Sequence, residues 1–209
     1  MRLRWAAALA LWGALAGMPG TATELGAQLL PPKIVSAIAA QPQMPGAGAP
    51  HPDVTVVEYL DYNCPYCRKS APVLRRLLQA DPGVQILFKE WPIFGEASAY
   101  AARCALAANW KGKFLVAHDA FIGATRDLDR NSDVDTVLRA AGLDMARLAA
   151  DRNAHATQID ALLARSVSET HALGLQGTPV FLVGNQLIAS SVTLSQLQRF
   201  VAQARAAAR

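Results

Sequence analysis

Cysteine and histidine are scarce in this sequence. Its 209 residues include three cysteines and four histidines, and only Cys64 and Cys67 stand close together. A zinc site would need a second pair of ligands at similar spacing, and Cys104 and the isolated histidines do not supply one, so zinc is disfavoured. Those histidines are His51, His118, His155 and His171. A c-type haem attachment is excluded because Arg68, and not a histidine, follows the second cysteine.

Charge is also sparse, and neither sign dominates. Charged residues make up 17% of the chain, with 20 Lys and Arg against 16 Asp and Glu. The basic residues are spread along the predicted helices, which is typical of a solvated surface and not of a nucleic-acid interface. We therefore expect no nucleic-acid partner.

Long apolar runs are missing except near the N-terminus. There, two arginines precede the short apolar stretch from Trp5 to Ala16, and small residues suitable for cleavage follow as far as Ala22. This pattern predicts a secretory signal peptide over residues 1–22 and a periplasmic mature protein. The apolar stretch is too short to span a bilayer, so the mature chain is expected to be soluble.

Residues 23–53 differ in composition from the rest of the chain. Glu24 to Ala40 is compatible with a short helix interrupted by Pro31-Pro32, and Gln41 to Pro52 is rich in Pro, Gly and Ala. Such a composition is typical of an extended linker. The sequence therefore predicts an N-terminal segment and linker, followed by one folded domain over residues 54–209.

The domain begins with the pattern of a β-α-β unit. A buried strand, a helix with apolar residues at helical spacing and a second strand follow one another, and a long helical stretch comes next. The predicted strands are Val54 to Leu60, Val84 to Glu90, Val180 to Val183 and Gln186 to Ala189; the helices are Pro65 to Ala80, several between about 96 and 173, and one from Thr193. The order is β-α-β, helical insert, β-β-α.

Two helix starts have recognisable capping signals. Thr193 with Gln196 three residues later forms a capping-box pattern at the last helix. Ser132 with Asp135 resembles a capping box within the insert, and Gly142 is suited to end that helix.

The two neighbouring cysteines stand where the first strand gives way to the first helix. Pro65 suits the first helical position, which places Cys64 at the N-cap. Backbone N–H groups and the helix dipole favour a thiolate there, so we expect Cys64 to be the nucleophile and Cys67 to resolve mixed disulfides. A disulfide closing so short a loop stabilises little, so a structural role is disfavoured. The sequence therefore predicts a redox site.

These motifs resemble a known family. A Cys-x-x-Cys at the first strand-helix junction, a helical block and a later Gly177-Thr178-Pro179 are similar to the DsbA family of secreted bacterial thiol-disulfide oxidoreductases. The runs from Glu58 to Cys67 and from Phe88 to Gly95 look closest to its ScsC-like branch, which is linked with copper-stress tolerance. The resemblance covers about Val54 to Ala202. It implies an α/β, thioredoxin-like fold with an inserted helical domain over about 96–173.

The resemblance also implies a substrate-binding site beside the cysteines. Pro179 matches the family's cis-proline, which lies across from the redox motif. The backbone of Thr178 would then bind an extended substrate segment by short β-strand addition. Pro65 and Tyr66 complete the expected substrate-binding set.

Glu58 and Lys89 are the charged residues expected in the site. Glu58 stands six residues before Cys64, where the family carries a buried acid, and burial should raise its pKa and suit it to exchange protons with Cys67. Lys89, on the neighbouring strand, is expected to pair with Glu58. The alternative for the two charges is a structural ion pair without a role in the chemistry.

No cofactor is expected beyond the redox-active Cys64–Cys67 disulfide. The implied partners are unfolded or misoxidised exported proteins and a membrane redox partner. Without histidine at Tyr66, the site is expected to be less oxidising than the His-containing members, and oxidation and isomerisation both stay open. Cu(I) binding by the two cysteines and a chaperone-like activity are the alternative functions.

Two further features fall outside the motif. Cys104 lies in a run of small apolar residues and is expected to be buried and inert, with an intermolecular or regulatory disulfide as the alternative. The segment that drives self-association in ScsC-like proteins is short here and broken by prolines, which favours a monomer.

Overall fold

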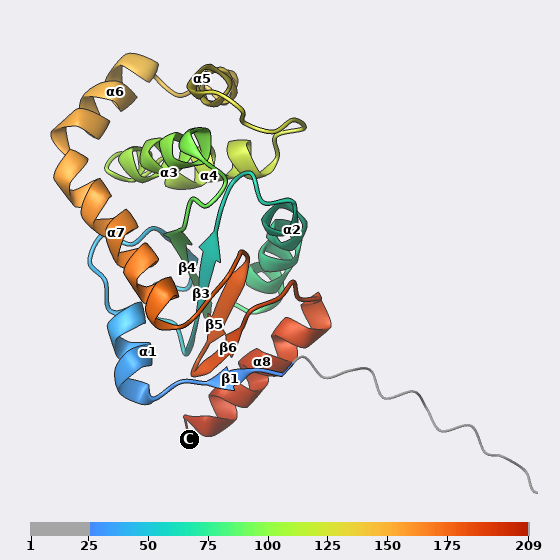
Figure 1. The fold of residues 1–209 in the computed structure, drawn as a ribbon. Helices are drawn as coiled ribbons and strands as arrows, with labels where there is room; N and C mark the ends of the chain where they lie inside the picture. The colour runs from blue at the N-terminus through green and yellow to red at the C-terminus, as the bar shows by residue number, and fades with distance from the viewer. Residues whose placement is uncertain (1–25, 209) are drawn as a thin grey trace, which may run out of the picture.

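The computed structural model describes residues 26–208, and the predicted signal peptide lies outside them. A six-stranded sheet with the order β1-β6-β5-β3-β4-β2 forms the centre (Figure 1). Strand β3 (Val54–Leu60) pairs in parallel with β4 (Val84–Glu90) and antiparallel with β5 (Val180–Val183), which forms a hairpin with β6 (Gln186–Ile188). Helix α2 (Pro65–Ala80) connects the two parallel strands. These elements confirm the predicted β-α-β unit and terminal hairpin.

The sheet buries side chains on both faces, because the central strands are apolar at nearly every position. Val56, Leu60 and Ile86 belong to the larger core, which also includes residues of α2, the helical insert and the C-terminal helix. Val57 and Tyr59, which alternate with them, belong to a second core with residues of the N-terminal segment and of the C-terminal end of the insert. Residues of one strand therefore face two different surroundings.

The insert consists of five helices that stand mostly above one end of the sheet (Figure 1). They are α3 (Glu96–Asn109), α4 (Phe114–Ile122), α5 (Asn131–Ala140), α6 (Met145–Ala154) and α7 (Ala156–Ala172). The last of them returns along the sheet and packs against β4. The small apolar face of α3 is buried, which places Cys104 in the core as expected.

The start of α5 differs from the predicted capping box. The helix begins one residue earlier than Ser132, and the carboxylate of Asp133 accepts the backbone N–H of Arg130. Asp135 instead accepts a hydrogen bond from Tyr100. Gly142 follows the helix end with φ 78°, as its role at the C-terminus requires.

Residues 26–53 contribute two short strands to the sheet, where the sequence predicted an N-terminal segment and an extended linker. Strand β1 (Gln28–Leu29) pairs with β6, and β2 (Gly46–Gly48) pairs with β4. Between them, α1 (Pro32–Ala39) buries Ile38 in the second core. The expected helix thus begins only after Pro31, because two consecutive prolines cannot lie inside a helix and Pro32 suits its first position.

Helix α8 (Leu194–Ala207) closes the chain with the predicted capping box. Thr193 accepts the N–H of Gln196, and the Gln196 amide oxygen accepts the N–H of Thr193. Near its other end, Arg205 donates two hydrogen bonds each to Asp53 and Asp81. Hydrogen bonds from this guanidinium lower the pKa of both carboxyls. The clamp fixes the end of α8 against the start of β3.

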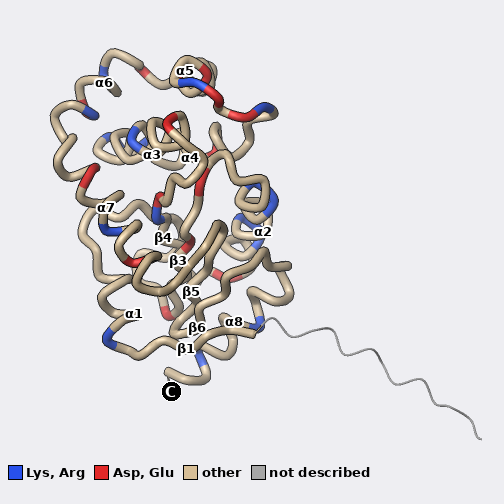
Figure 2. The backbone as a smooth tube through the Cα atoms, viewed as in Figure 1, with Lys and Arg blue, Asp and Glu red and all other residues tan. Residues whose placement is uncertain are grey.

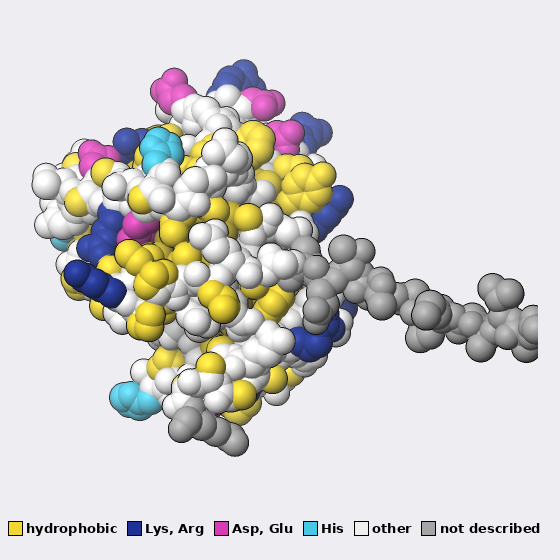
Figure 3. Space-filling model, turned by 60° about the horizontal axis from the view of Figure 1, so that its bottom comes forward, with side chains coloured by type: hydrophobic (Ala, Val, Ile, Leu, Met, Phe, Trp, Pro, Cys, Tyr) yellow, Lys and Arg dark blue, Asp and Glu magenta, His cyan; other side chains and the backbone are white. Residues whose placement is uncertain are grey.

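Charged residues are dispersed over the described surface. Figure 2 shows Lys and Arg distributed over several helices, with acidic residues also present within the central strands. In the space-filling view of Figure 3, basic side chains lie at separate places around the face and form no single patch. No helix among residues 26–208 is long and apolar enough to cross a membrane.

Candidate active site

The two cysteines occupy the positions that the sequence predicted. Cys64 is the N-cap of α2, Pro65 is the first helical residue, and Cys67 lies on the first turn. Both cysteines are free thiols in this structure, with exposed fractions of 1% for Cys64 and 0% for Cys67.

The surroundings of Cys64 favour its thiolate. The Cys67 thiol donates a hydrogen bond to its sulfur, and the backbone N–H groups of Cys67 and Tyr66 add further donors at the helix start. Together these interactions outweigh burial and lower the pKa of Cys64 to about 5. The pKa of Cys67 is raised, because its thiol proton is held by Cys64 and because it is buried. One sulfur is thus a nucleophile at neutral pH and the other a protonated thiol.

We expect the alkylation of Cys64 by iodoacetamide to report this lowered pKa. Since its thiolate is half populated near pH 5, the rate should be flat from pH 6 to pH 9 and fall about tenfold per pH unit below 5. Stopped samples analysed by mass spectrometry measure the rate at each cysteine. Cys104 serves as the internal control, because burial raises the pKa of its thiol and it should react only after unfolding. A Cys64 rate that still rises between pH 7 and pH 9 would contradict the thiolate assignment.

The loop opposite the sulfurs has the expected conformation. The Thr178–Pro179 peptide bond is cis. The Sγ atom of Cys64 lies 3.1 Å from the carbonyl oxygen of Thr178. A cavity of about 510 Å³ adjoins this loop, and its lining comprises Tyr66, Gly174–Pro179 and Ala189–Ser191. Tyr66 is 55% exposed, so an extended segment bound at Thr178 could contact it. Pro65 begins the helix and does not line this cavity.

Glu58 lies in the protein interior, on the strand that leads to the cysteines. It is buried in the middle of β3, and burial together with the charge of Cys64 raises its pKa to about 8. Its charge in turn helps to raise the pKa of Cys67. Glu58 is therefore electrostatically coupled to both sulfurs, as a proton-exchanging acid must be.

The expected pair between Glu58 and Lys89 does not form. In the register of β3 and β4, Glu58 is level with Phe88, whereas Lys89 is level with Tyr59. Because successive side chains point to opposite faces, Glu58 and Lys89 lie on different sides of the sheet. Lys89 pairs instead with Glu169 of α7. Lys89 therefore belongs to the second face, away from the sulfurs.

Glu169 is the centre of a polar cluster on that second face. It accepts hydrogen bonds from Lys89, Tyr59, Gln41 and Arg165. The cluster connects β3, β4 and α7 with the segment that follows α1. Burial lowers the pKa of Lys89 to about 8 against the raising effect of Glu169. The arrangement of this polar cluster indicates that it has a structural role.

Replacing Lys89 with methionine is expected to destabilise the protein by about 3 kcal/mol, because Glu169 then loses a buried cationic partner. The rate of disulfide exchange should stay within about twofold of the parent, since the change leaves the opposite face intact. Urea unfolding and an exchange assay on the same samples measure the two effects. Loss of disulfide exchange without loss of stability would show that Lys89 takes part in the exchange reaction.

Asp61 organises the loops around the sulfurs and was not identified from the sequence. Its buried carboxylate accepts the backbone N–H groups of Asn63, Ile93 and Phe94 and the hydroxyl of Ser98. One carboxylate thereby joins the residue before Cys64 to the loop after β4. Its position directly after the first strand was the available signal.

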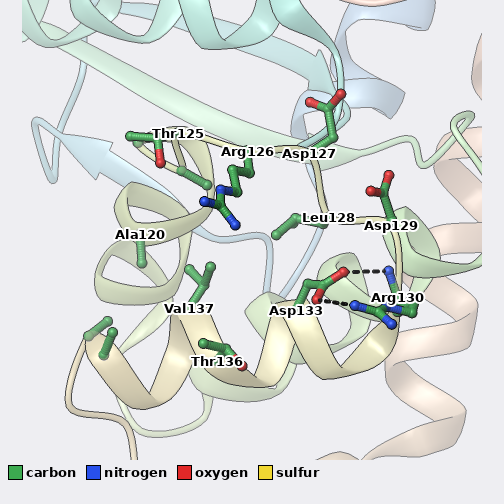
Figure 4. Close-up of a pocket in the computed structure, with 14 residues that line it drawn as sticks. Ala120, Thr125, Arg126, Asp127, Leu128, Asp129, Arg130, Asp133, Thr136 and Val137 are labelled. Carbon is green, nitrogen blue, oxygen red and sulfur yellow. Dashed lines mark hydrogen bonds and ion pairs between the residues drawn. The ribbon is translucent and has the colours of Figure 1, made fainter.

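Asn63 and Arg68 connect the start of α2, which carries the two cysteines, to the helical insert. Asn63 exchanges hydrogen bonds with the backbone of Leu128, and Arg68 pairs with Asp127. The same loop, with α5, lines a larger cavity of about 1040 Å³, in which Arg130 and Asp133 form an ion pair (Figure 4). That cavity contains neither cysteine.

The described residues hold no group of three or more His, Cys, Asp or Glu side chains arranged for a metal ion. Two thiolates alone can still bind Cu(I), so the copper alternative rests on Cys64 and Cys67 without further ligands.

Comparison with known proteins places these features in context. Residues 55–202 match the family described as DSBA-like thioredoxin domain. A thioredoxin-like oxidoreductase from Silicibacter pomeroyi DSS-3 is 42% identical, with a TM-score of 0.76 over 79% of this chain and 94% of that one. A periplasmic thioredoxin-like protein from Salmonella enterica serovar Typhimurium is 28% identical, with a TM-score of 0.71 over 86% and 99%. The catalytic domain of Proteus mirabilis ScsC is 26% identical, with a TM-score of 0.70 over 83% and 96%.

The curated relatives that match this chain are much longer than it is. The Na(+)/H(+) antiporter NhaA 3 of Salinispora tropica is 30% identical over 161 residues, which are 75% of this chain and 24% of that protein. The chain thus spans about a quarter of the length of the curated relatives it matches.

Proposed function

Because this chain belongs to the family of DsbA-like thioredoxin domains, we propose that it catalyses thiol-disulfide exchange in exported proteins through Cys64-Pro65-Tyr66-Cys67. One observation carries the proposal above the others. Cys64 combines a lowered pKa at a helix start with a position 3.1 Å from the carbonyl of Thr178, beside a cis-proline. A reactive thiolate next to a backbone that can bind an extended chain suits a protein substrate.

The reductive half-reaction follows from the two unequal sulfurs. The Cys64 thiolate attacks one sulfur of a substrate disulfide, and the other substrate sulfur leaves as a thiolate. Cys67 then loses its proton and attacks the Cys64 sulfur of the mixed disulfide. The second substrate thiolate departs, so the substrate gains two electrons and the Cys64–Cys67 disulfide forms. The reverse sequence oxidises a substrate, and there protonated Glu58 gives its proton to the departing Cys67.

The location and the partners form part of the same proposal. The signal-peptide pattern over residues 1–22 favours export to the periplasm. Substrates are then unfolded or misoxidised exported proteins, and a membrane redox partner resets the cysteines. The disulfide itself is the redox group, and no other cofactor is needed.

Two assays on one preparation test the proposal and the direction of exchange. We expect the protein to catalyse either the reduction of insulin or the refolding of scrambled ribonuclease. The redox state of the cysteines in cells separates the directions, since an oxidised pair indicates a disulfide donor and a reduced pair an isomerase or reductase. Tight Cu(I) binding with no catalysis in either assay would instead support the copper alternative.

A further inference from the structure

A second buried carboxyl shares the sheet face of Glu58. Glu90 ends β4, is 2% exposed, and is level with Leu60 in the β3–β4 register. Since alternate residues share a face, Glu58, Leu60, Phe88 and Glu90 all point to the same side of the sheet. Neighbouring strands lie about 4.8 Å apart and two residues span about 6.6 Å, so one water could connect the two carboxyls.

Glu90 is the inner end of a short chain of hydrogen bonds. The Tyr62 hydroxyl lies 2.6 Å from Oε1 of Glu90 and 3.3 Å from Nδ1 of His118. A tyrosine has only one hydroxyl proton, and the shorter contact takes it. His118 must then donate its Nδ1–H to the Tyr62 oxygen, which leaves Nε2 as an acceptor. The pKa of His118 is lowered to about 4 by burial, in agreement with this neutral ring.

The two ends of this chain are suited to passing a proton onward. At the inner end, Oε2 of Glu90 is buried and has no hydrogen-bond partner among the described residues. At the outer end, His118 lines a cavity of about 130 Å³ together with Arg75 and Asp119. Burial raises the pKa of Glu90 well above its usual range, which favours the protonated form of its carboxyl. An orphaned acid inside and a histidine beside a cavity outside point to a proton path.

Several charged or titratable groups act on this chain from the elements around it. They are Glu58 of β3, Asp61 of the following loop, Arg75 in the middle of α2 and Asp119 of α4, and Cys64 acts in turn on Glu58. Apart from Arg75, these groups carry or can carry negative charge. They therefore oppose a bare carboxylate in the interior and favour its rapid reprotonation.

We propose that Glu90, Tyr62 and His118 form a proton relay that reprotonates Glu58 during disulfide exchange. The relay rests on the proposed function, because it serves the proton that Glu58 transfers to or from Cys67. It also gives a role to a buried acid that the exchange steps described above leave unused.

In the oxidising direction, each transfer moves one proton. A substrate thiolate attacks Cys64, Cys67 leaves as a thiolate, and Glu58 protonates it. Glu90 passes its proton to Glu58 and receives the hydroxyl proton of Tyr62. The Nδ1 proton of His118 moves to the Tyr62 oxygen, and water in the adjoining cavity protonates Nε2. One proton has entered, and no electron has moved along the relay.

Resetting of the active site runs the relay backwards. When the Cys64–Cys67 disulfide re-forms, the Cys67 proton returns to Glu58 and one proton leaves through Nε2 of His118. This restores the Nδ1–H tautomer, so successive half-reactions leave the histidine unchanged. The two tautomers of one imidazole thus correspond to the two redox states of the site.

Tyr62→Phe removes one oxygen from the relay and is the first test. We expect the rate at which a peptide thiol reduces the oxidised protein to fall about tenfold at pH 7. Glu90→Gln should do the same, and both variants should alter the pH profile and the solvent deuterium isotope effect. Stopped-flow fluorescence between pH 5 and pH 9 measures all three. Equal rates and profiles in parent and variants would overturn the relay.

Tyr59→Phe is the matched control. It deletes a buried hydroxyl from β3, three residues before Tyr62, but this hydroxyl donates to Glu169 on the opposite face. It should cost stability while leaving the rate within about twofold of the parent. An equal loss of rate in Tyr59→Phe and Tyr62→Phe would show that any buried hydroxyl matters, and the relay would be rejected.

Two further measurements cover a variant that folds poorly and a protein that fails as an enzyme. His118→Ala opens space beside the cavity, and added imidazole should restore its lost rate only if the ring carries protons. Redox-difference infrared spectra need no turnover. In them, the protonated-carboxyl band of Glu90 should shift with the state of Cys64 and Cys67, and this band should disappear in Glu90→Gln. Absence of that band overturns the relay, whereas absence of catalysis in the parent overturns the proposed function.

Discussion

Replacing Cys64 with serine is expected to lower the rate of thiol-disulfide exchange by at least about 10³-fold. The serine hydroxyl does not ionise near neutral pH, so the helix start and the neighbouring N–H groups have no anion to stabilise. Cys67 cannot take over, because its own pKa is raised and its sulfur stays protonated as a thiol. Insulin reduction and ribonuclease refolding on purified variants measure the loss. Cu(I) binding should disappear as well, since one thiolate remains.

Cys104→Ser is the control for this change. It makes the same substitution at the third cysteine, whose thiol is buried and whose pKa is raised by that burial. Exchange should stay within about twofold of the parent. A chaperone-like activity that survives Cys64→Ser would show that the apolar surface acts independently of the sulfurs. Comparable losses in both variants would point to a structural need for thiols and contradict the nucleophile assignment.

Glu58→Gln is expected to stabilise the reduced protein by about 3 kcal/mol at pH 7. In the folded state the pKa of Glu58 is about 8, whereas the ordinary pKa of a glutamate is 4.5. Between these values the folded state binds more protons than the unfolded state, so stability falls as pH rises. This loss of stability from the buried Glu58 carboxyl is absent below pH 4.5 and reaches its full size above pH 8. Glutamine does not ionise, so the free energy of unfolding of Glu58→Gln does not fall with pH in this way.

Urea unfolding of the reduced protein at pH 4.5, 7 and 8.5 checks this prediction. The gain from Glu58→Gln should be near zero at the lowest pH and largest at the highest. Exchange should at the same time slow by about 10²-fold, because the general acid is lost. Glu96→Gln, at an exposed helix start, is the control and should cost less than about 1 kcal/mol. A pH-independent gain would mean that Glu58 is already ionised in the folded state.

The parts of the fold that the sequence predicted are those with local signals. The apolar strand β3, Pro65 at the start of α2 and the Thr193–Gln196 capping box all depend on residues next to one another in the chain. The redox site was predictable for the same reason, because both sulfurs and the helix start lie within four residues. The DsbA-like resemblance extended the prediction to the cis-proline.

The N-terminal strands lacked such signals. Gly46-Ala47-Gly48 has no side-chain alternation, and its strand conformation comes from pairing with β4, which the sequence of this segment does not encode. Lys89 finds its partner 80 residues later in Glu169, a contact set by the return of α7 along the sheet. The register between β3 and β4, by contrast, could have been predicted from the sequence. Two seven-residue strands that begin together, at Val54 and Val84, put Glu58 level with Phe88.

The two edges of the sheet have a consequence for solubility. Both edge strands, β1 and β2, are only two and three residues long, and they cover parts of β6 and β4 whose backbone groups would otherwise be open. Short edges offer little template for pairing with another chain. A chain shortened to begin at Asp53 would retain every residue of the redox site but expose these hydrogen-bonding edges. The N-terminal segment thus covers backbone groups of β6 and β4 that another chain could otherwise pair with.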